Sequence, residues 1–248
     1  MPIAVVTGVP RSGKSYFSVY KIYEIYKNEL ISFKKKHKYI HWFLYYWYSF
    51  FPPASKEVFR WTYTNINEFK FDLYPQTKPL IYKELYAKLS RLHRFHVDRC
   101  ATDTELVQKA KELDLYDVYI VWDECHHNLY GKEDEVITWW LTYHGHLHQE
   151  VHLITQNPSL IPTGYTKLGE YFYKVGSASK SLSKKSFRIG SYESAGFHKN
   201  GRSKVEIILP FKDEVFNLYK SGKPQKRKAI LKKYVFIIPI LVLLVVYL

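Results

Sequence analysis

The sequence contains very little cysteine, only Cys100 and Cys125 in 248 residues. The two cysteines match neither a disulfide framework nor a zinc site, which excludes small cystine-stapled and zinc-ribbon classes. Their scarcity is typical of proteins from a reducing compartment. We also expect no signal peptide, because an apolar strand-like run and a glycine-containing loop begin almost at Met1. No internal repeat is apparent in the sequence.

Acidic residues are few as well: 23 Asp and Glu stand against 37 Lys and Arg, for a net charge of +14. This excess favours an anionic partner, which is phosphate, nucleic acid or a membrane surface, and charge alone does not choose among them. Aromatic residues are abundant, at 18% with 23 tyrosines. The length suits one large α/β domain, or one domain with appendages.

One octapeptide organises the rest of the chain, because it matches the phosphate-binding P-loop pattern G-x-x-x-x-G-K-[ST]. An apolar run at residues 3–7 precedes it, and a stretch with helical periodicity follows it. Backbone N–H groups of such a loop wrap a β-phosphate at a helix N-terminus. Lys14 is expected to reach the β- and γ-phosphates, and the Ser15 hydroxyl to bind Mg²⁺. The candidate ATP-binding residues are Gly8, Val9, Pro10, Arg11, Ser12, Gly13, Lys14, Ser15 and Tyr16.

An acidic pair, Asp123-Glu124, directly follows the apolar run at residues 118–122. An NTPase needs a carboxylate in the magnesium shell and a base that polarises the attacking water. Asp123 is the candidate for the first role, through a bound water, and Glu124 for the second. Gln156, which follows the strand-like run at 152–155, is a candidate catalytic residue that senses the γ-phosphate.

Strand and helix patterns alternate along the chain, which predicts an α/β fold: a P-loop NTPase with a mostly parallel sheet flanked by helices. A small β-rich, antiparallel extension is expected after it. The predicted strands are 3–7, 59–64, 118–122 and 152–155, with short strands of the extension at 171–175, 186–192 and 204–209. Helices are predicted from the loop to about Ser32, within 80–113, and at 133–143.

Residues 234–248 form an uncharged, almost wholly apolar run behind a cluster of lysines and one arginine. Fifteen helical residues measure about 22 Å, and adding residues 229–231 with snorkelling lysines brings the helix near the roughly 30 Å of a bilayer core. We therefore expect a single transmembrane helix, with the basic flank and the N-terminal domain in the cytoplasm. The aromatic stretch 42–51 fits equally a membrane interface and a hydrophobic hairpin packed on the domain or on another subunit.

Six histidines invite a metal hypothesis: His126, His127, His144, His146, His148 and His152. Alternate positions 144, 146 and 148 would share one face of a strand. No carboxylate or cysteine completes a recognisable ligand set, and Gly145 favours a loop, so metal binding is disfavoured. A nucleophilic role for Cys125 is disfavoured too.

Several short motifs occur together in one order: GVPRSGKS after the first strand, Thr64-Asn65-Ile66, IVWDECHH, and His144-x-His146 leading into the Leu153–Gln156 run. In this order they resemble the zonular occludens toxin (Zot) family, over about residues 1–180. The resemblance implies a cytoplasmic P-loop ATPase anchored in the bacterial inner membrane, which powers the export of filamentous phage. Gly145 stands where the family often has arginine, His148 where glycine is usual and Glu150 where aspartate is usual, so no arginine finger is assigned.

These observations divide the chain into an ATPase domain at 1–180 with an insertion at 42–53, a β-rich extension at 181–218, a basic linker at 219–233 and a transmembrane segment at 234–248. The leading hypothesis is an inner-membrane ATPase for assembly and export of filamentous phage. Its expected partners are further copies in a ring, membrane lipid, and phage assembly and export proteins. One alternative is a nucleotide-switched protein that handles single-stranded DNA through the basic segment 180–188. The other is a host-directed toxin.

Overall fold

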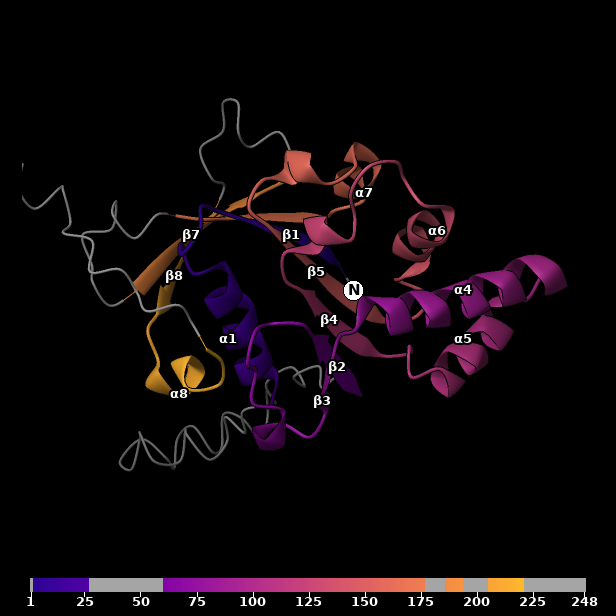
Figure 1. Ribbon diagram of the computed structural model, residues 1–248, viewed down its shortest axis with the longest axis horizontal. Coiled ribbons are helices and arrows are strands. Elements are labelled where there is room, and N and C mark those ends of the chain that lie inside the picture. Colours follow the sequence, from indigo (N-terminus) through magenta and orange to yellow (C-terminus); the bar gives the residue numbers. More distant parts are fainter. Residues whose placement is uncertain (1, 27–59, 177–185, 194–204, 221–248) are drawn as a thin grey trace, which may run out of the picture.

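The computed structural model of the protein describes residues 2–26, 60–176, 186–193 and 205–220. Within these ranges eight strands form one sheet in the order β3-β2-β4-β5-β1-β6-β7-β8 (Figure 1). The strands are β1 (Ile3–Thr7), β2 (Trp61–Thr64), β3 (Thr77–Pro79), β4 (Val118–Trp122), β5 (Gln149–Thr155), β6 (Tyr171–Val175), β7 (Ser186–Tyr192) and β8 (Val205–Pro210).

Six of these strands, β1 to β6, pair in parallel with their neighbours, and only β7 and β8 are antiparallel. The prediction of a mostly parallel sheet is confirmed. The expectation that residues 171–175 begin the antiparallel extension is confirmed on one side only: β6 pairs antiparallel with β7, but it also pairs in parallel with β1, Ala4 opposite Tyr171. The chain reaches β6 by a crossover from β5, and such a connection places the two strands in the same direction.

Helices cover both faces of the sheet. They are α1 (Lys14–Tyr26), α4 (Tyr82–Arg99), α5 (Asp103–Glu112), α6 (Glu135–Tyr143), α7 (Thr163–Lys167) and α8 (Asp213–Phe216), with short 3₁₀ turns η1 (Phe71–Leu73), η2 (Cys125–His127) and η3 (Pro158–Leu160). One buried cluster joins α4, α5, α6 and α7 to the sheet, and a second joins α1 and α8 to the opposite face (Figure 1). Alternate residues of β4 enter the two clusters: Ile120 lies in the first and Val121 in the second.

Two predicted boundaries differ from the observed elements for identifiable reasons. The helical stretch expected within 80–113 is two helices, because Cys100 adopts a left-handed conformation (φ 45°) and Thr102 then caps α5 in a capping box with Glu105. Strand β5 begins at Gln149 rather than at 152. A glutamine is tolerated at that buried position because Trp140 Nε1 donates to its Oε1 at 2.6 Å and its own amide donates to Leu115 O.

The histidine-rich segment 144–148 forms turns and not a strand, in agreement with the interpretation of Gly145. Several predictions fall outside the described residues: the helix beyond Tyr26, the aromatic insertion 42–53, the lysines of the basic segment 180–185, and the chain from 221 onward. Among the described ranges, no helix has the length and apolar character needed to cross a bilayer.

Candidate nucleotide-binding site

The loop between β1 and α1 has the backbone shape of a phosphate cradle. Gly13 has φ +108°, and Arg11 is left-handed with φ 61°. A Cβ atom added at Gly13 would lie 2.6 Å from the Phe187 ring of β7, so both the dihedral angle and the close approach require glycine here. Val9, Pro10 and Arg11 are exposed at the tip of the loop.

Two further features of the loop fit a phosphate ligand. A Cβ atom at Gly8 would lie 2.6 Å from Ser12 Oγ and 2.8 Å from Val175 O, so the close packing at the start of the loop requires glycine. The Ser12 hydroxyl is buried, and within the described part of the chain no group accepts or donates a hydrogen bond to it. A buried hydroxyl of this kind is available to an oxyanion.

The Lys14 ammonium lies across the loop. Its side chain is buried, and Nζ donates to Gly8 O at 3.0 Å and to Val9 O at 3.5 Å. Burial lowers the pKa of Lys14, and the negative charges of Glu124 and Asp123 oppose that shift. The loop therefore concentrates one partly desolvated positive charge beside two carboxylates.

Ser15, the second residue of α1, meets the acidic pair at the end of β4: Ser15 Oγ donates to Asp123 Oδ2 at 2.8 Å. Burial raises the pKa of Asp123, the hydrogen bond from Ser15 lowers it, and the charge of Glu124 raises it further. A hydroxyl and a carboxylate at this separation are hard oxygen donors that suit Mg²⁺. The residues present thus fit the predicted metal.

Asn65 orients the backbone of Asp123, a role that the sequence analysis did not assign. It follows β2 directly, and its Oδ1 accepts from Asp123 N at 2.6 Å while its Nδ2 donates to Asp123 O at 2.8 Å. The available signal was its position, an amide side chain at the carboxyl end of a strand that neighbours β4.

Glu124 and Gln156 meet at the same edge, because β5 lies between β1 and β4 in the sheet. Gln156 Nε2 donates to Glu124 Oε1 at 3.3 Å. The structure therefore brings Lys14, Ser15, Asp123, Glu124 and Gln156 together at the carboxyl ends of three adjacent parallel strands. Ligands of open α/β sheets bind at such an edge.

The Tyr16 side chain lies elsewhere. It is buried among Phe187, Phe211 and Phe216, and its hydroxyl donates to Pro210 O at 2.8 Å and accepts from Lys212 N at 2.8 Å. Although Tyr16 was a predicted nucleotide-binding residue, its side chain packs α1 against the segment after β8.

The candidate metal-ligating histidines contact different partners. His144 Nε2 lies 3.7 Å from Glu170 Oε1, His146 Nδ1 lies 3.2 Å from Asp103 Oδ2, and His152 Nε2 lies 3.0 Å from Glu150 Oε1. Cys125 is buried, and burial raises the pKa of its thiol far above the usual range. The thiol therefore stays protonated, which agrees with the rejection of Cys125 as a nucleophile.

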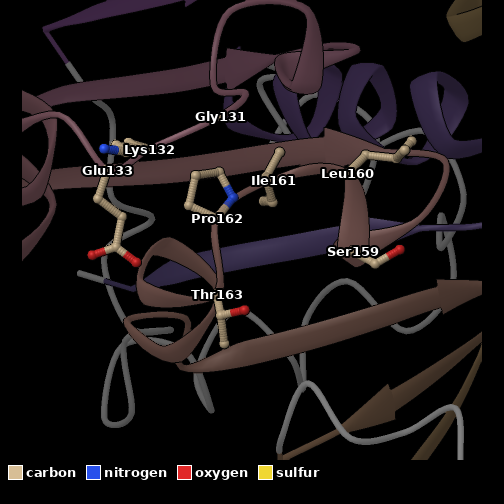
Figure 2. Close-up of a pocket in the computed structure, with 8 residues that line it drawn as sticks. All are labelled: Gly131, Lys132, Glu133, Ser159, Leu160, Ile161, Pro162 and Thr163. Atoms are coloured by element: carbon tan, nitrogen blue, oxygen red, sulfur yellow. The ribbon is translucent and has the colours of Figure 1, made fainter.

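A separate cavity of about 470 Å³ lies between the loops that follow η2 and η3 (Figure 2). Figure 2 shows Lys132 and Glu133 at one end of it and Ser159 and Leu160 at the other. Glu133 Oε1 accepts from Gly164 N at 2.7 Å, which joins the two loops. The predicted site residues do not line this cavity.

A mostly parallel sheet with helices on both faces, and a glycine-bounded phosphate loop beside an acidic pair, define a P-loop α/β protein. Residues 47–226 match the family model described as zonular occludens toxin (Zot), so the chain belongs to the Zot family. The resemblance expected from the sequence is confirmed. The matched range starts and ends later than the expected 1–180, and the phosphate loop precedes it.

Solved structures with a similar shape include the N-terminal domain of zonular occludens toxin from Neisseria meningitidis, with 15% identity, 88% of this chain and 98% of that chain covered, and a TM-score of 0.47. Another is the genome packaging NTPase B204 from Sulfolobus turreted icosahedral virus 2 in complex with ATP-γ-S (14% identity, 85% and 98% covered, TM-score 0.44). A third is the KaiC-like protein PH0186 from Pyrococcus horikoshii OT3 (11% identity, 84% and 89% covered, TM-score 0.42). A comparison with curated proteins finds no match.

Proposed function

We propose that this Zot-family chain is an ATPase that powers phage assembly. The observation that carries the proposal is the hydrogen bond of 2.8 Å between Ser15 Oγ and Asp123 Oδ2, which joins the phosphate loop to the acidic pair. A loop that only stored a phosphate would not need a carboxylate pair at its mouth. An NTPase needs both parts.

Each residue of the site has a distinct task in this proposal. The loop backbone and Lys14 would bind the β- and γ-phosphates, while Ser15 and, through a water molecule, Asp123 would hold Mg²⁺. The bound metal would neutralise part of the phosphate charge. Glu124 polarises the attacking water by accepting its hydrogen bond, and Gln156, which bonds to Glu124, lies where it can respond to the γ-phosphate.

A finer proposal concerns the cellular location and the partners of the chain. We infer a single-pass anchor at residues 234–248 in the bacterial inner membrane, with the ATPase domain in the cytoplasm and filamentous phage as the exported cargo. The apolar run, its basic flank and the family support this proposal. The partners would be further copies of the chain in a ring, membrane lipid, and phage assembly and export proteins.

The central test is ATP hydrolysis by the full-length chain in detergent. Lys14→Ala should leave the thermal unfolding midpoint nearly unchanged and reduce hydrolysis by about 10²-fold or more, because the phosphates lose their buried cation. Lys132→Ala removes an exposed lysine and is the matched control. Hydrolysis by Lys14→Ala at the parent rate would contradict the assignment of the site.

Two further measurements test the setting. The mass of Glu124→Gln, a variant expected to bind ATP without hydrolysing it, should rise to that of a ring when ATP is added, and a monomer with and without nucleotide excludes the ring.

The full chain should sediment with inner membranes, and a chain ending at residue 233 should not. Recovery of the full chain in the soluble or secreted fraction would instead favour the host-directed toxin.

The net charge of +14 keeps one alternative under test, a nucleotide-switched protein that handles single-stranded DNA. Binding to single-stranded DNA that weakens steeply with salt, without matching binding to acidic liposomes, would favour that alternative. Equal affinity for both surfaces would show only general attraction to anions.

A further inference from the structure

Both carboxylate oxygens of Glu124 face side chains that belong to or contact the end of β5. Oε1 accepts from Gln156 Nε2 at 3.3 Å, and Oε2 lies 3.3 Å from His126 Nδ1. His126 belongs to η2, two residues beyond Glu124, and its Nδ1 also lies 3.2 Å from the Oγ1 atom of Thr155, the last residue of β5. From the sequence alone, His126 was a candidate only as a metal ligand.

The directions of the hydrogen bonds of Thr155 follow from the single proton on its hydroxyl group. Thr155 Oγ1 donates its single proton to Asn157 O at 3.2 Å, so it can only accept from His126. The hydrogen bond between His126 and Thr155 therefore uses a proton on Nδ1 of His126. The same Nδ1 atom lies 3.3 Å from Glu124 Oε2 without forming a hydrogen bond to it, so the imidazole bonds to Thr155 and makes an electrostatic contact with the carboxylate.

Glu124 also needs external support because of its backbone. It is left-handed, with φ 47° and ψ 44°, a conformation that costs a non-glycine residue energy and persists when the surroundings hold it. The Oε2 atom is buried and accepts no hydrogen bond from the described residues, so the His126 imidazole 3.3 Å away is the polar group that it faces.

We propose that His126 and Thr155 are positioning residues for Glu124: Thr155 orients the imidazole, and the imidazole lies against Oε2 while Gln156 holds Oε1 by a hydrogen bond. The carboxylate is thereby set in one orientation relative to the phosphate loop, which a group that polarises water requires. This inference rests on the proposed ATPase function. It adds that the contacts at the carboxyl end of β5 affect kcat and not the affinity for ATP.

The test is steady-state ATP hydrolysis by full-length variants in detergent, with binding of a fluorescent ATP analogue measured alongside. His126→Ala should lower kcat by about 10–100-fold with KM for ATP within about 2-fold of the parent, because the contact that confines Oε2 is lost while the phosphate loop is intact. Thr155→Val keeps the shape of the side chain, removes the acceptor, and should lower kcat by roughly 3–10-fold.

Conservative variants separate positioning from a merely structural role. His126→Asn retains an N–H donor near the position of Nδ1, and Thr155→Ser retains the hydroxyl, so each should recover most of the kcat that its partner variant loses. His127→Ala is the matched control, because His127 is the exposed neighbour whose ring is tilted by 39° to that of His126 at a centroid distance of 4.4 Å. It should keep the parent kcat.

The outcomes distinguish this inference from the function on which it rests. A parent chain without Lys14-dependent hydrolysis overturns both. A parent that hydrolyses ATP, with His126→Ala at the parent kcat or with His126→Asn no better than His126→Ala, overturns the positioning role alone. If His126→Ala does not fold, Thr155→Val and Thr155→Ser decide: equal turnover in those two variants refutes the proposal.

Discussion

One side chain, Asn65, fixes both the N–H and the C=O group of Asp123 by hydrogen bonds of 2.6 and 2.8 Å. Two bonds to one peptide segment restrict the direction in which the Asp123 carboxylate leaves the backbone. That direction decides whether Oδ2 reaches Ser15. A residue that touches neither nucleotide nor metal in the proposed site thus controls its geometry.

Asn65→Ala is therefore expected to lower ATP turnover by about 10-fold and to reduce the free energy of unfolding by only about 1 kcal/mol, because the amide is exposed. Turnover is measured in the hydrolysis assay and stability by denaturant titration. Asn67→Ala, at an exposed neighbouring position, should change neither quantity. A large loss of stability with unchanged turnover would mean that Asn65 only holds the loop together.

At Gly13 we expect a single added methyl group to reduce both stability and nucleotide binding. Gly13→Ala introduces a Cβ atom 2.6 Å from the Phe187 ring at φ +108°, so we expect a loss of roughly 1–3 kcal/mol in unfolding free energy and weaker binding of an ATP analogue. Gly145→Ala is the matched control, because its added Cβ would meet no atom within 4 Å. Unchanged stability and binding in Gly13→Ala would contradict the close packing of the loop on β7.

At this scale the sequence was informative where residues are adjacent and uninformative where they are distant. Lys14 and Ser15 were identified by a local octapeptide, and Asp123-Glu124 by the end of an apolar run. Asn65 and His126 were not assigned, since their roles depend on contacts with Asp123 and with β5 that no local pattern encodes.

Helix α1 and the segment after β8 are joined through one hydroxyl group. Tyr16 Oη donates to Pro210 O and accepts from Lys212 N, both at 2.8 Å. The Lys212 ammonium in turn lies 2.8 Å from Glu24 Oε1 near the other end of α1. The helix that begins at the phosphate loop is thus attached to the polypeptide that leads toward residue 221.

Tyr16→Phe tests this attachment, because it keeps the aromatic ring and removes only the hydroxyl. The Lys212 N–H and the Pro210 carbonyl then lose a partner, so we expect a loss of about 1–3 kcal/mol in unfolding free energy by denaturant titration. Tyr171→Phe, at a half-exposed position on β6, should cost less than about 0.5 kcal/mol. Equal stabilities of the two variants would show that the hydroxyl bridge contributes nothing measurable.

The existence of the longer elements was predictable from periodicity, whereas short elements, element ends and pairing partners were not. The α4–α5 break depends on one left-handed residue, Cys100, inside an otherwise helical pattern. The early start of β5 depends on a buried glutamine whose partners come from α6 and from Leu115. Strand β3, with three residues and a proline, has too short a pattern to be recognised.

A polar network crosses the interior between α1 and the sheet. Lys21 Nζ lies 3.4 Å from Glu150 Oε1, His152 Nε2 lies 3.0 Å from the same oxygen, and the Tyr119 hydroxyl lies 2.9 Å from His152 Nδ1. His152 is fully buried, and burial lowers its pKa to about 4 although the hydrogen bond that it donates to Glu150 opposes the shift. The folded protein therefore strongly prefers the neutral imidazole.

This preference predicts a pH dependence of stability for the whole molecule. The contribution of His152 is complete above the unfolded pKa of about 6.5 and is lost as the pH falls toward the folded value of about 4. Between pH 7 and 4.5 the loss should amount to about 2–3 kcal/mol in the free energy of unfolding. Denaturant titration of the parent and of His152→Gln at both pH values measures it.

The variant separates His152 from the other groups that titrate in the same range. His152→Gln should be less stable than the parent at pH 7 and should lose less stability on acidification. His127→Gln, at an exposed position, should keep the parent slope. Identical slopes for the parent and His152→Gln would contradict the assignment of this pH dependence to the buried imidazole.

The sequence by itself determined the α/β alternation, the phosphate loop and the acidic pair, because each depends on residues within one or two turns or strands. Only the tertiary structure decided that β5 lies between β1 and β4, that β6 runs parallel to β1, and that Asn65 and His126 meet the acidic pair. Strand order is set by how buried faces pack across the whole sheet, and local periodicity is the same for many orders. The site is assembled from short patterns, and their contacts are a property of the fold.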